Sequence, residues 1–556
     1  MELNYTKNKN SELFNELSNE SLVNIKTLQN YIPIYCLFFD LNDKNYNSIN
    51  LNTFYKLTSI KSKLNYSKFS GTIKDNSNNS IDTKIFFKYS PLIDPIKFMT
   101  GKYDNSYNIL KLPKIKNDKD VIDKILDINN SAYSDSFFSF LSSILLNKFN
   151  FLNGIDFYGS FLGIKNNFIV NIEDDLEYLD DSDFFHKYNN KLFNILDNDN
   201  CKNYFNNTKK NKQALKIDNN IYEKELHICE LDKENDENNL SNIHIEYTTN
   251  LHDKKKIKTN ELNNSDKSCS SRYSNTNSSN NEDSESEISD DSSNEYDSSD
   301  ADDEILANIL EFPVQTIALE CCDDTLDSYI MNNNKLSDDE WESIVLQVIF
   351  TLIVYQKVFD FTHNDLHSNN IVYKETEKKY LYYKYDNKHY KVPTYGKIYK
   401  IIDFGRAIYK YKGNIICSDS YAIDGDAHTQ YNTEPYFNEN KPRLEPNYSF
   451  DLCRLGCSLF DYLIDNVDDI HKLKSPIKKL IIQWVYDDSN KNILYKNNGS
   501  ERYPDFKLYK MIARTVHKHN PTNVIKHSIF EKNILSKKRI NNQSAILNID
   551  NLPILQ

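Results

Sequence analysis

The sequence predicts a mixed α+β fold in two parts, a small β-rich part followed by a larger, mainly helical part. Segments rich in β-branched and aromatic residues, which are typical of strands, lie before residue 180 and return at 314–320. An apolar helix expected at 341–355 then opens the helical part. A long polar stretch at about 186–304 interrupts the β-rich part.

The β-rich part is expected to hold one helix among its strands. Residues 83–89 (TKIFFKY) predict a strand that is closed by Ser90 and Pro91. Residues 133–147 predict a helix, because apolar side chains recur there at helical spacing. Residues 157–172 predict two strands around a turn at 165–167, and 314–320 predict another strand.

The helical part begins at a recognisable signal. Ser337 and Glu340 have the spacing of a capping box before the helix at 341–355. The expected boundaries are an N-terminal extension at 1–54, the first section of the small lobe at 55–185, an acidic, mostly disordered insert at 186–304, the last strand and a hinge at 305–324, the helical lobe at 325–531 and a C-terminal tail at 532–556.

The formal net charge of −14 is concentrated in one segment. Residues 281–304 contain twelve Asp and Glu residues and no Lys or Arg. The remainder is nearly neutral, so neither a nucleic-acid nor a membrane partner is predicted. The acidic insert is expected to be a solvated spacer or, alternatively, a tail that docks a basic partner or is phosphorylated.

Cysteine usage and the N-terminus predict an intracellular and most simply cytoplasmic protein. The nine cysteines have irregular spacings, as reduced thiols do, and none has the paired spacing of a zinc site. The start of the chain shows no apolar core before a cleavage site, so no signal peptide is expected. The most apolar run, 344–355, is shorter than the roughly 20 residues that span a bilayer, which predicts a buried helix.

Two motifs carry most of the functional information. Residues 363–370 (HNDLHSNN) are followed by 401–405 (IIDFG). Phosphoryl transfer needs one carboxylate to orient the attacking hydroxyl, and it needs Asn and Asp oxygens to hold Mg²⁺ against the phosphates. Magnesium prefers such hard oxygen ligands.

With these motifs the chain resembles the eukaryotic protein kinase-like superfamily, in which the catalytic loop is H-R-D-L-x-x-x-N and the metal motif is D-F-G. Within that superfamily it resembles a divergent serine/threonine kinase. The resemblance implies a two-lobed kinase-like fold that uses ATP and Mg²⁺ to phosphorylate Ser or Thr of an unknown protein substrate. It implies that Asp365 orients the substrate hydroxyl, and that Asn370 and Asp403 hold the metal.

Two further segments extend the resemblance. Residues 451–456 (DLCRLG) are similar to the family's D-x-W-S-L-G, which implies that Asp451 braces the catalytic loop; a helix N-cap is the alternative. Residues 85–88 (IFFK) lie where the family has V-A-I-K, which implies that Lys88 contacts the α- and β-phosphates. No Glu occurs on the following helix, so Asp135 is expected to replace the usual partner of the lysine.

The adenine site is also placed by resemblance. Leu319 would lie beside the adenine pocket, and the backbone of Glu320, Cys321 and Cys322 would bind the base. A buried core position is the alternative for Leu319. Residues 418–445 are expected to form the substrate-binding segment, which ends at Glu434-Pro435 or at Glu445-Pro446. Residues 380–385 and 389–392 predict a hairpin.

The chain departs from the family pattern at three places. No G-x-G-x-x-G precedes Lys88, where Gly71 is the one glycine of the region. Asn364 replaces the arginine that pairs with a phosphorylated segment, so switching by phosphorylation there is not expected. His367 replaces the lysine that neutralises the γ-phosphate.

His367 and the missing glycines leave alternatives open. Asp-Leu-His also occurs in haspin-like kinases and in small-molecule kinases, so a phosphotransferase for a small molecule is one rival. A neutral imidazole can still donate one hydrogen bond to phosphate. Metal binding by His363 and His367 is a further alternative. The absent glycine loop makes a catalytically weak pseudokinase scaffold the second rival.

Overall fold

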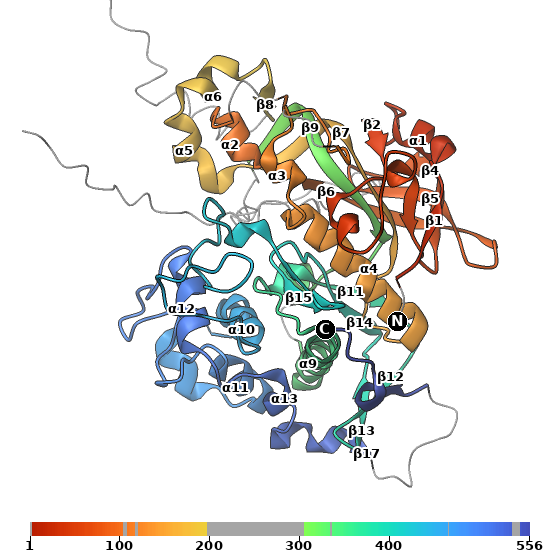
Figure 1. Ribbon diagram of the computed structural model, residues 1–556. Helices are drawn as coiled ribbons and strands as arrows, with labels where there is room; N and C mark the ends of the chain where they lie inside the picture. Colours follow the sequence, from red (N-terminus) through yellow and green to blue (C-terminus); the bar gives the residue numbers. More distant parts are fainter. Residues whose placement is uncertain are drawn as a thin grey trace, which may run out of the picture.

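The computed structural model describes residues 3–103, 108–116, 120–196, 305–333, 336–464, 466–535 and 545–556. It is a mixed α+β protein, as predicted. In Figure 1 a large twisted sheet with helix α4 occupies the upper half, and helices α9 to α13 occupy the lower half.

The large sheet has seven strands in the order β2-β7-β9-β6-β5-β4, with β8 paired to β9. All of its pairings are antiparallel. The strands are β2 (Ile25–Gln29), β4 (Lys56–Lys63), β5 (Lys68–Lys74), β6 (Ser80–Pro91), β7 (Phe157–Asn171), β8 (Phe193–Ile195) and β9 (Leu306–Glu320).

Strand β7 corrects one prediction. Residues 157–171 form one continuous strand where two strands around a turn were expected. Asn167 does have a positive φ of 54°, as a turn residue would. Its neighbours nevertheless stay in register, since Asn166 pairs with Glu311 and Phe168 with Ile309. The equally long strand β9 offers hydrogen-bond partners along the whole of β7, and this overrides the local turn signal.

The first 54 residues are not a separate extension. These residues include helix α1 (Ser11–Leu17) and strands β1 (Tyr5–Lys7) and β3 (Ile49–Leu51), which pair with each other. Strand β2 forms the edge of the large sheet by pairing with β7. Leu17 and Ile25 are fully buried in the main core. The expected boundary at residue 55 therefore cuts through a folded unit.

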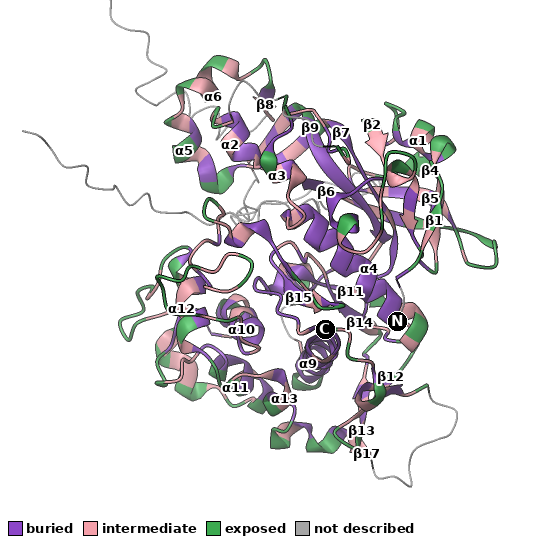
Figure 2. Ribbon diagram, in the orientation of Figure 1, coloured by how far each residue is buried: buried purple, intermediate pink, exposed green. Residues whose placement is uncertain are grey.

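Helix α4 (Ser131–Phe149) contains the helix predicted at 133–147. Asn130 caps its first turn by accepting a hydrogen bond from the Ala132 amide, and it ends at Asn150 in the left-handed conformation. Figure 2 shows that α4 is buried along most of its length. Four short helices also belong to the upper half: α2 (Pro95–Met99), α3 (Asp123–Leu126), α5 (Leu176–Asp180) and α6 (Asp183–Tyr188).

Residues 186–196, which were expected to belong to the insert, are part of the fold. Residues 186–196 complete α6 and form β8, which pairs with β9. The remainder of the predicted insert, 197–304, lies outside the described residues, and with it the acidic segment 281–304.

Helix α9 (Asp338–Phe359) has the predicted capping box, in which Ser337 Oγ accepts the Glu340 amide at 3.2 Å and Glu340 Oε2 accepts the Ser337 amide at 2.9 Å. In the described part of the chain it is the one helix long and apolar enough to cross a membrane, but almost all of that stretch is buried inside the protein. One hydrophobic core runs from the large sheet through α4 to α9. The remaining helices are α8 (Leu326–Asn332), α10 (Phe450–Leu463), α11 (Pro476–Gln483), α12 (Lys507–Thr515) and α13 (Pro521–Val524).

Small sheets complete the lower half. Strands β10 (Asp324–Thr325), β11 (Ile371–Glu375) and β14 (Lys397–Ile401) form one sheet. The predicted hairpin is present as β12 (Tyr380–Tyr385) and β13 (Lys388–Pro393). Strands β17 (Ile534–Leu535) and β18 (Leu547–Asn548) flank this hairpin, so the described part of 532–556 is packed against the fold. Strands β15 (Ile408–Tyr411) and β16 (Asn414–Cys417) pair with each other.

Candidate active site

The loop at 363–370 is held in place by Asp451. The amides of His363 and Asn364 donate to its two carboxylate oxygens, each at 2.9 Å. Asp451 lies in the first turn of α10 and is fully buried. The N-cap position belongs to Ser449, so the predicted brace is confirmed and the N-cap alternative is wrong.

His363 is a buried residue of this loop and not a metal ligand. Its Nδ1 accepts a hydrogen bond from the Asp365 amide at 3.3 Å, and its Nε2 lies 2.9 Å from the carbonyl oxygen of Ile402. This pair of contacts requires the neutral tautomer with the proton on Nε2. Neither ring nitrogen is left for a metal, and the described residues contain no group of three or more His, Cys, Asp or Glu side chains that could hold one.

Asn364 suits a conformation that most residues avoid. Its φ is 64°, in the left-handed region where Asn is tolerated. Its side-chain amide donates to the Arg406 carbonyl at 3.2 Å, and its oxygen accepts from the Tyr431 hydroxyl at 2.8 Å. Asn364 therefore ties the loop to two downstream segments by neutral hydrogen bonds.

Lys88, Asp135 and Asp403 form one ion cluster, in which Asp135 is buried and the other two residues are partly buried. The Lys88 ammonium lies 2.7 Å from Asp135 Oδ2 and 2.9 Å from Asp403 Oδ1. Asp135 comes from α4, and its other oxygen accepts the Phe404 amide at 2.8 Å. The predicted replacement of Glu by Asp135 is thus seen in the geometry. Strand β6, helix α4 and the segment after β14 meet at these three residues.

Charge balance explains the ionisation of this cluster. Burial acts to lower the pKa of Lys88, but the two carboxylates outweigh it and raise that pKa well above its usual value. Burial acts to raise the pKa of Asp403, but the Lys88 ammonium holds it below its usual value. For Asp135 burial prevails and raises the pKa. The cluster is therefore a cation shared by two carboxylates of unequal acidity.

Asp365 is kept ionised by residues that the sequence did not single out. The Tyr509 hydroxyl donates to its Oδ1 at 2.7 Å, and Arg454 Nε lies 4.0 Å from the same oxygen. Burial acts to raise the pKa of Asp365, but the charges of Arg406 and Arg454, with the Tyr509 hydrogen bond, hold it far below its usual range. Tyr509 lies on α12, far along the chain from the loop.

Asn370 is oriented with its oxygen free. Its side-chain amide donates to the Asp365 carbonyl at 2.9 Å. Its Oδ1 is buried and accepts no hydrogen bond from any residue that the structure describes. A buried amide oxygen without a donor is costly unless a ligand satisfies it. Asn370 and Asp403 thus offer the hard oxygen atoms that Mg²⁺ prefers, and these residues fit such an ion.

His367 is neutral at physiological pH. Burial lowers the pKa of its imidazole to about 4, although the Asp365 carboxylate opposes this shift. Its Nε2 is buried and has no hydrogen-bond partner in the described structure. The side chain can donate or accept one further hydrogen bond without carrying charge.

Several of these residues border one cavity of about 70 Å³. Its walls include the ion cluster of Lys88, Asp135 and Asp403, together with Asp365. Arg406, Ser420 and Asp426 close another side. Residues from the large sheet, from α4 and from the lower half are thereby brought around one space.

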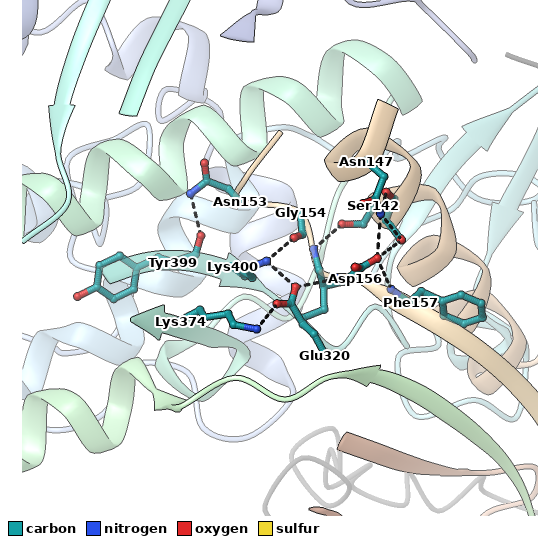
Figure 3. A network of polar contacts seen from close by, with 12 residues as sticks. Ser142, Asn147, Asn153, Gly154, Asp156, Phe157, Glu320, Lys374, Tyr399 and Lys400 are labelled. Carbon is teal, nitrogen blue, oxygen red and sulfur yellow. Dashed lines mark hydrogen bonds and ion pairs between the residues drawn. The ribbon is translucent and has the colours of Figure 1, made fainter. Parts of the chain in front are cut away.

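Glu320 has a structural role beside this site. Figure 3 shows its carboxylate among two lysines and the amide of Asp156. The buried Lys400 pairs with Oε1, Lys374 lies 3.2 Å from Oε2, and the Asp156 amide donates to Oε1 at 2.8 Å. The Glu320 amide itself donates to the Asp156 carbonyl at 3.0 Å. That amide is consequently not available to an adenine base.

Leu319 and Cys322, which were also expected near adenine, lie at the same end of β9. Leu319 is buried, with Phe86 and Phe157 as its strand partners. Cys322 follows the strand and is half-buried. Burial raises the pKa of the Cys322 thiol far above its usual value, so this cysteine is uncharged.

A short turn joins the two strands that precede β6, the strand of Lys88. Residues 64–67 connect β4 to β5, and the Leu64 amide donates to the Lys68 carbonyl at 2.9 Å. The Ser67 carbonyl accepts the Phe87 amide at 2.8 Å, so the turn lies beside the residue before Lys88. Gly71 lies within β5, where a Cβ atom would come 2.6 Å from the Ser59 carbonyl. It is needed for close strand packing and not for contact with phosphate.

The predicted substrate-binding segment ends in an exposed ion cluster. Arg443 lies 2.6 Å from Glu434 and 2.7 Å from Glu445. The two Glu-Pro pairs that could close this segment are thus joined by one arginine. The geometry does not choose between them.

Comparison with known proteins gives two partial matches. The chain is 37% identical over 99 residues to "Probable serine/threonine-protein kinase" of Dictyostelium discoideum, a match that covers 16% of this chain and 8% of that protein. It is 29% identical over 154 residues to "Putative serine/threonine-protein kinase" of Acanthamoeba polyphaga mimivirus, with 26% of this chain and 36% of that protein covered. No family model matches the chain.

These matches indicate a kinase-like relationship over part of the chain. The chain spans about a third or less of the length of these two proteins. Within the site, sequence patterns found the residues that belong to short motifs. Tyr509, Arg406 and Asp426 carry no such signal, because they meet the site only through the packing of distant segments.

Proposed function

We propose that this chain is an ATP-dependent serine/threonine protein kinase with a two-lobed kinase-like fold. In this proposal the large sheet with α4 is the small lobe, and the part from α8 to α13 is the large lobe. The observation that carries it is the meeting of Lys88, Asp135 and Asp403 within 3 Å, beside the loop that presents Asp365 and Asn370. Separated segments converge there on the groups that phosphoryl transfer requires.

Each residue has a defined task in this proposal. Lys88 would contact the α- and β-phosphates of ATP, and Asp135 would hold its ammonium in place. Asn370 Oδ1 and the Asp403 carboxylate would hold Mg²⁺, whose charge screens the phosphates when it is bound. His367 would donate one neutral hydrogen bond to the γ-phosphate. The uncharged state of His367 means that Lys88 and the metal would supply most of the positive charge.

Asp365 would act chiefly by orientation. Its Oδ1 is taken by the Tyr509 hydroxyl, which leaves the other oxygen to accept the hydroxyl of the substrate. A carboxylate with so low a pKa is a weak base. It would therefore receive the proton only late, when bond formation to phosphorus has made the hydroxyl acidic. This fits the largely dissociative character of phosphoryl transfer.

The test is transfer of labelled γ-phosphate from ATP with Mg²⁺ to mixed protein substrates and to the chain itself. Asp365→Asn and Asp403→Asn each remove a carboxylate with little change of shape, and they are expected to lower the rate by about 10² or more. Asp468→Asn, on the exposed 3-10 turn 467–472, is the matched control and is expected to retain full activity. Equal incorporation by all four proteins would point to a contaminating kinase and contradict the proposal.

Two other functions are separated by simple additional measurements. A screen of small-molecule hydroxyl acceptors would reveal a metabolite kinase, since labelled product would then be small. The turn at 64–67 lacks the glycines that cover phosphates in the family it resembles, which is the observation that favours a scaffold. If saturating ATP with Mg²⁺ leaves the melting temperature unchanged, the scaffold is favoured over both enzymes.

A further inference from the structure

Asp419 joins the segment after β16 to the beginning of α4. Its Oδ1 accepts the amide of Ser131, the first residue of α4, at 3.0 Å. Its Oδ2 pairs with the Lys124 ammonium, which comes from α3. Its own amide donates to the Asn129 carbonyl at 2.7 Å. One side chain, only 6% exposed, thus contacts both sides of the turn that leads into α4.

This contact acts on the helix that carries Asp135. Asp135 follows Ser131 by about one helical turn, and its carboxylate positions Lys88 at 2.7 Å. The first amides of a helix have no partner within the helix. In α4 Asp419 accepts the amide of Ser131, and Asn130 accepts that of Ala132. A carboxylate at this end also interacts favourably with the helix dipole.

Neighbouring contacts hold the same segment from other sides. The Lys97 ammonium, on α2, donates to the Asp424 carbonyl at 2.8 Å. Arg406, next to Gly405, pairs with Asp426. The Tyr421 hydroxyl donates to the Arg406 carbonyl at 2.9 Å. The stretch from Asp419 to Asp426 is therefore fixed both to the small helices and to the residues after Asp403.

In the family that the chain resembles, a phosphate on this segment serves to pair with a basic residue. A phosphate offers negative oxygens to Lys or Arg and to helix amides, and this orders a loop. Here the Asp419 carboxylate already contacts both kinds of partner, a lysine side chain (Lys124) and a helix amide (that of Ser131). Asn364 stands where the family has the arginine that would receive the phosphate. Both observations point to a segment that is ordered by its own carboxylate.

We propose that Asp419 is a positioning residue that holds α4, and with it Asp135, against Lys88, so that the site is assembled without phosphorylation of residues 418–445. The expected effect of Asp419 on the phosphotransfer rate rests on the proposed function. The expected effect of Asp419 on α4 rests on the contacts of that helix alone. Supporting it, the Asp419 carboxylate raises the pKa of Lys124 above its usual value although burial opposes this.

The experiment compares the full chain with Asp419→Asn, Lys124→Met, the double variant and the exposed control Asp468→Asn. Hydrogen exchange of the amides at 131–135 reports on α4 whether or not the protein is active. We expect faster exchange in both single variants. Exchange in the double variant should be no faster than in the more affected single variant. The phosphotransfer rate with ATP is expected to fall about tenfold in each single variant. Wild-type protein is also treated with phosphatase, and its mass verifies that phosphate has been removed. This protein is expected to retain its phosphotransfer rate within about twofold.

Failure of this inference and failure of the proposed function give different experimental results. If wild type transfers no phosphate, the proposed function fails, and the exchange data alone decide whether Asp419 holds α4. Unchanged exchange at 131–135 in Asp419→Asn and in Lys124→Met would overturn the positioning role. Loss of the wild-type rate after phosphatase treatment would overturn independence from phosphorylation. Should Asp419→Asn not fold, Lys124→Met tests the same ion pair from the other side.

Discussion

The Lys88 ammonium lies 2.7 Å from Asp135 Oδ2, although aspartate is one methylene group shorter than the glutamate used by the family that the chain resembles. The second oxygen of Asp135 accepts the Phe404 amide at 2.8 Å, so the short side chain bridges β6 and the segment after Asp403. Helix α4 must therefore lie close to both. The compact cluster sets the distance between the sheet and the lower half of the molecule.

Asp135→Glu tests how tightly this cluster is packed. The longer side chain has to enter a fully buried position, so we expect it to lower the free energy of unfolding by about 1–3 kcal/mol. Urea denaturation measures the change. Asp183→Glu, in the exposed first turn of α6, adds the same methylene group at the surface and is expected to change stability by less than about 0.5 kcal/mol. An Asp135→Glu variant as stable as wild type would show that α4 can move outward.

Tyr509→Phe removes the hydroxyl that donates to Asp365 Oδ1 at 2.7 Å. A buried hydrogen bond to a charged group is worth about 1.5–3 kcal/mol, so a loss of unfolding free energy of that size is expected. If Tyr509 positions Asp365, kcat should also fall while KM for ATP stays constant. Tyr495→Phe loses a more exposed hydrogen bond to Asp461 and serves as the control. A rise in KM for ATP together with the fall in kcat would instead indicate a general loosening of the site.

Glu320→Gln tests the buried network of Figure 3. The change leaves the buried Lys400 ammonium without its carboxylate partner, which is expected to cost about 3–5 kcal/mol. Combining Glu320→Gln with Lys400→Met removes both charges, so the double variant should be more stable than the single one. Thermal unfolding of the three proteins measures the order. A double variant that is less stable than Glu320→Gln would contradict the ion-pair explanation.

The pH dependence of stability should expose two opposing buried groups. The folded-state pKa of His367 is lowered from 6.5 to about 4, so the unfolded chain binds the extra proton between these values and stability is lost as pH falls through them. The shift corresponds to about 3 kcal/mol. The folded-state pKa of Asp156 is raised from 3.8 to about 6, so the folded chain binds the extra proton and stability is lost as pH rises from about 4 to 6.

The contributions of His367 and Asp156 to the pH dependence of stability oppose each other between about pH 4 and 6. A variant of each residue separates the two contributions. Relative to wild type, His367→Gln should become more stable on acidification across this window, and Asp156→Asn should become less stable. Urea denaturation at several pH values measures both differences, and other titrating groups cancel in the comparison. Parallel curves for wild type and both variants would show that neither group titrates as its burial implies.

Local sequence patterns predicted the parts of the fold and site that depend on near neighbours. The capping box at Ser337 and Glu340 determines where α9 begins, and the structure confirms it. Asp135 could be chosen because it was the acid nearest in sequence on a helix without glutamate. Asp451 could be recognised because it belongs to a short motif at the start of a helix, here α10.

Other features depend on partners that are distant in sequence. The Asn-Asn pair at 166–167 resembles a turn, and only the length of β9 makes it part of one strand. Tyr509 reaches Asp365 from α12 through the packing of α10 and α12, and its own neighbourhood carries no motif. The place of β2 in the large sheet depends likewise on its pairing with β7.

Strands β8 and β9 pair at Ile195 and Ala307, and the Leu196 amide donates to the Leu306 carbonyl at 2.8 Å. The chain that leaves after β8 thus returns to the adjacent position on the same sheet. Topologically it is a hairpin connection, whose two ends are held together by the sheet regardless of what lies between them. The register of the sheet at this point is set by the pairing of β8 with β9 and not by the length of chain between them. This connection is the natural place in this fold to excise residues or to insert a foreign domain.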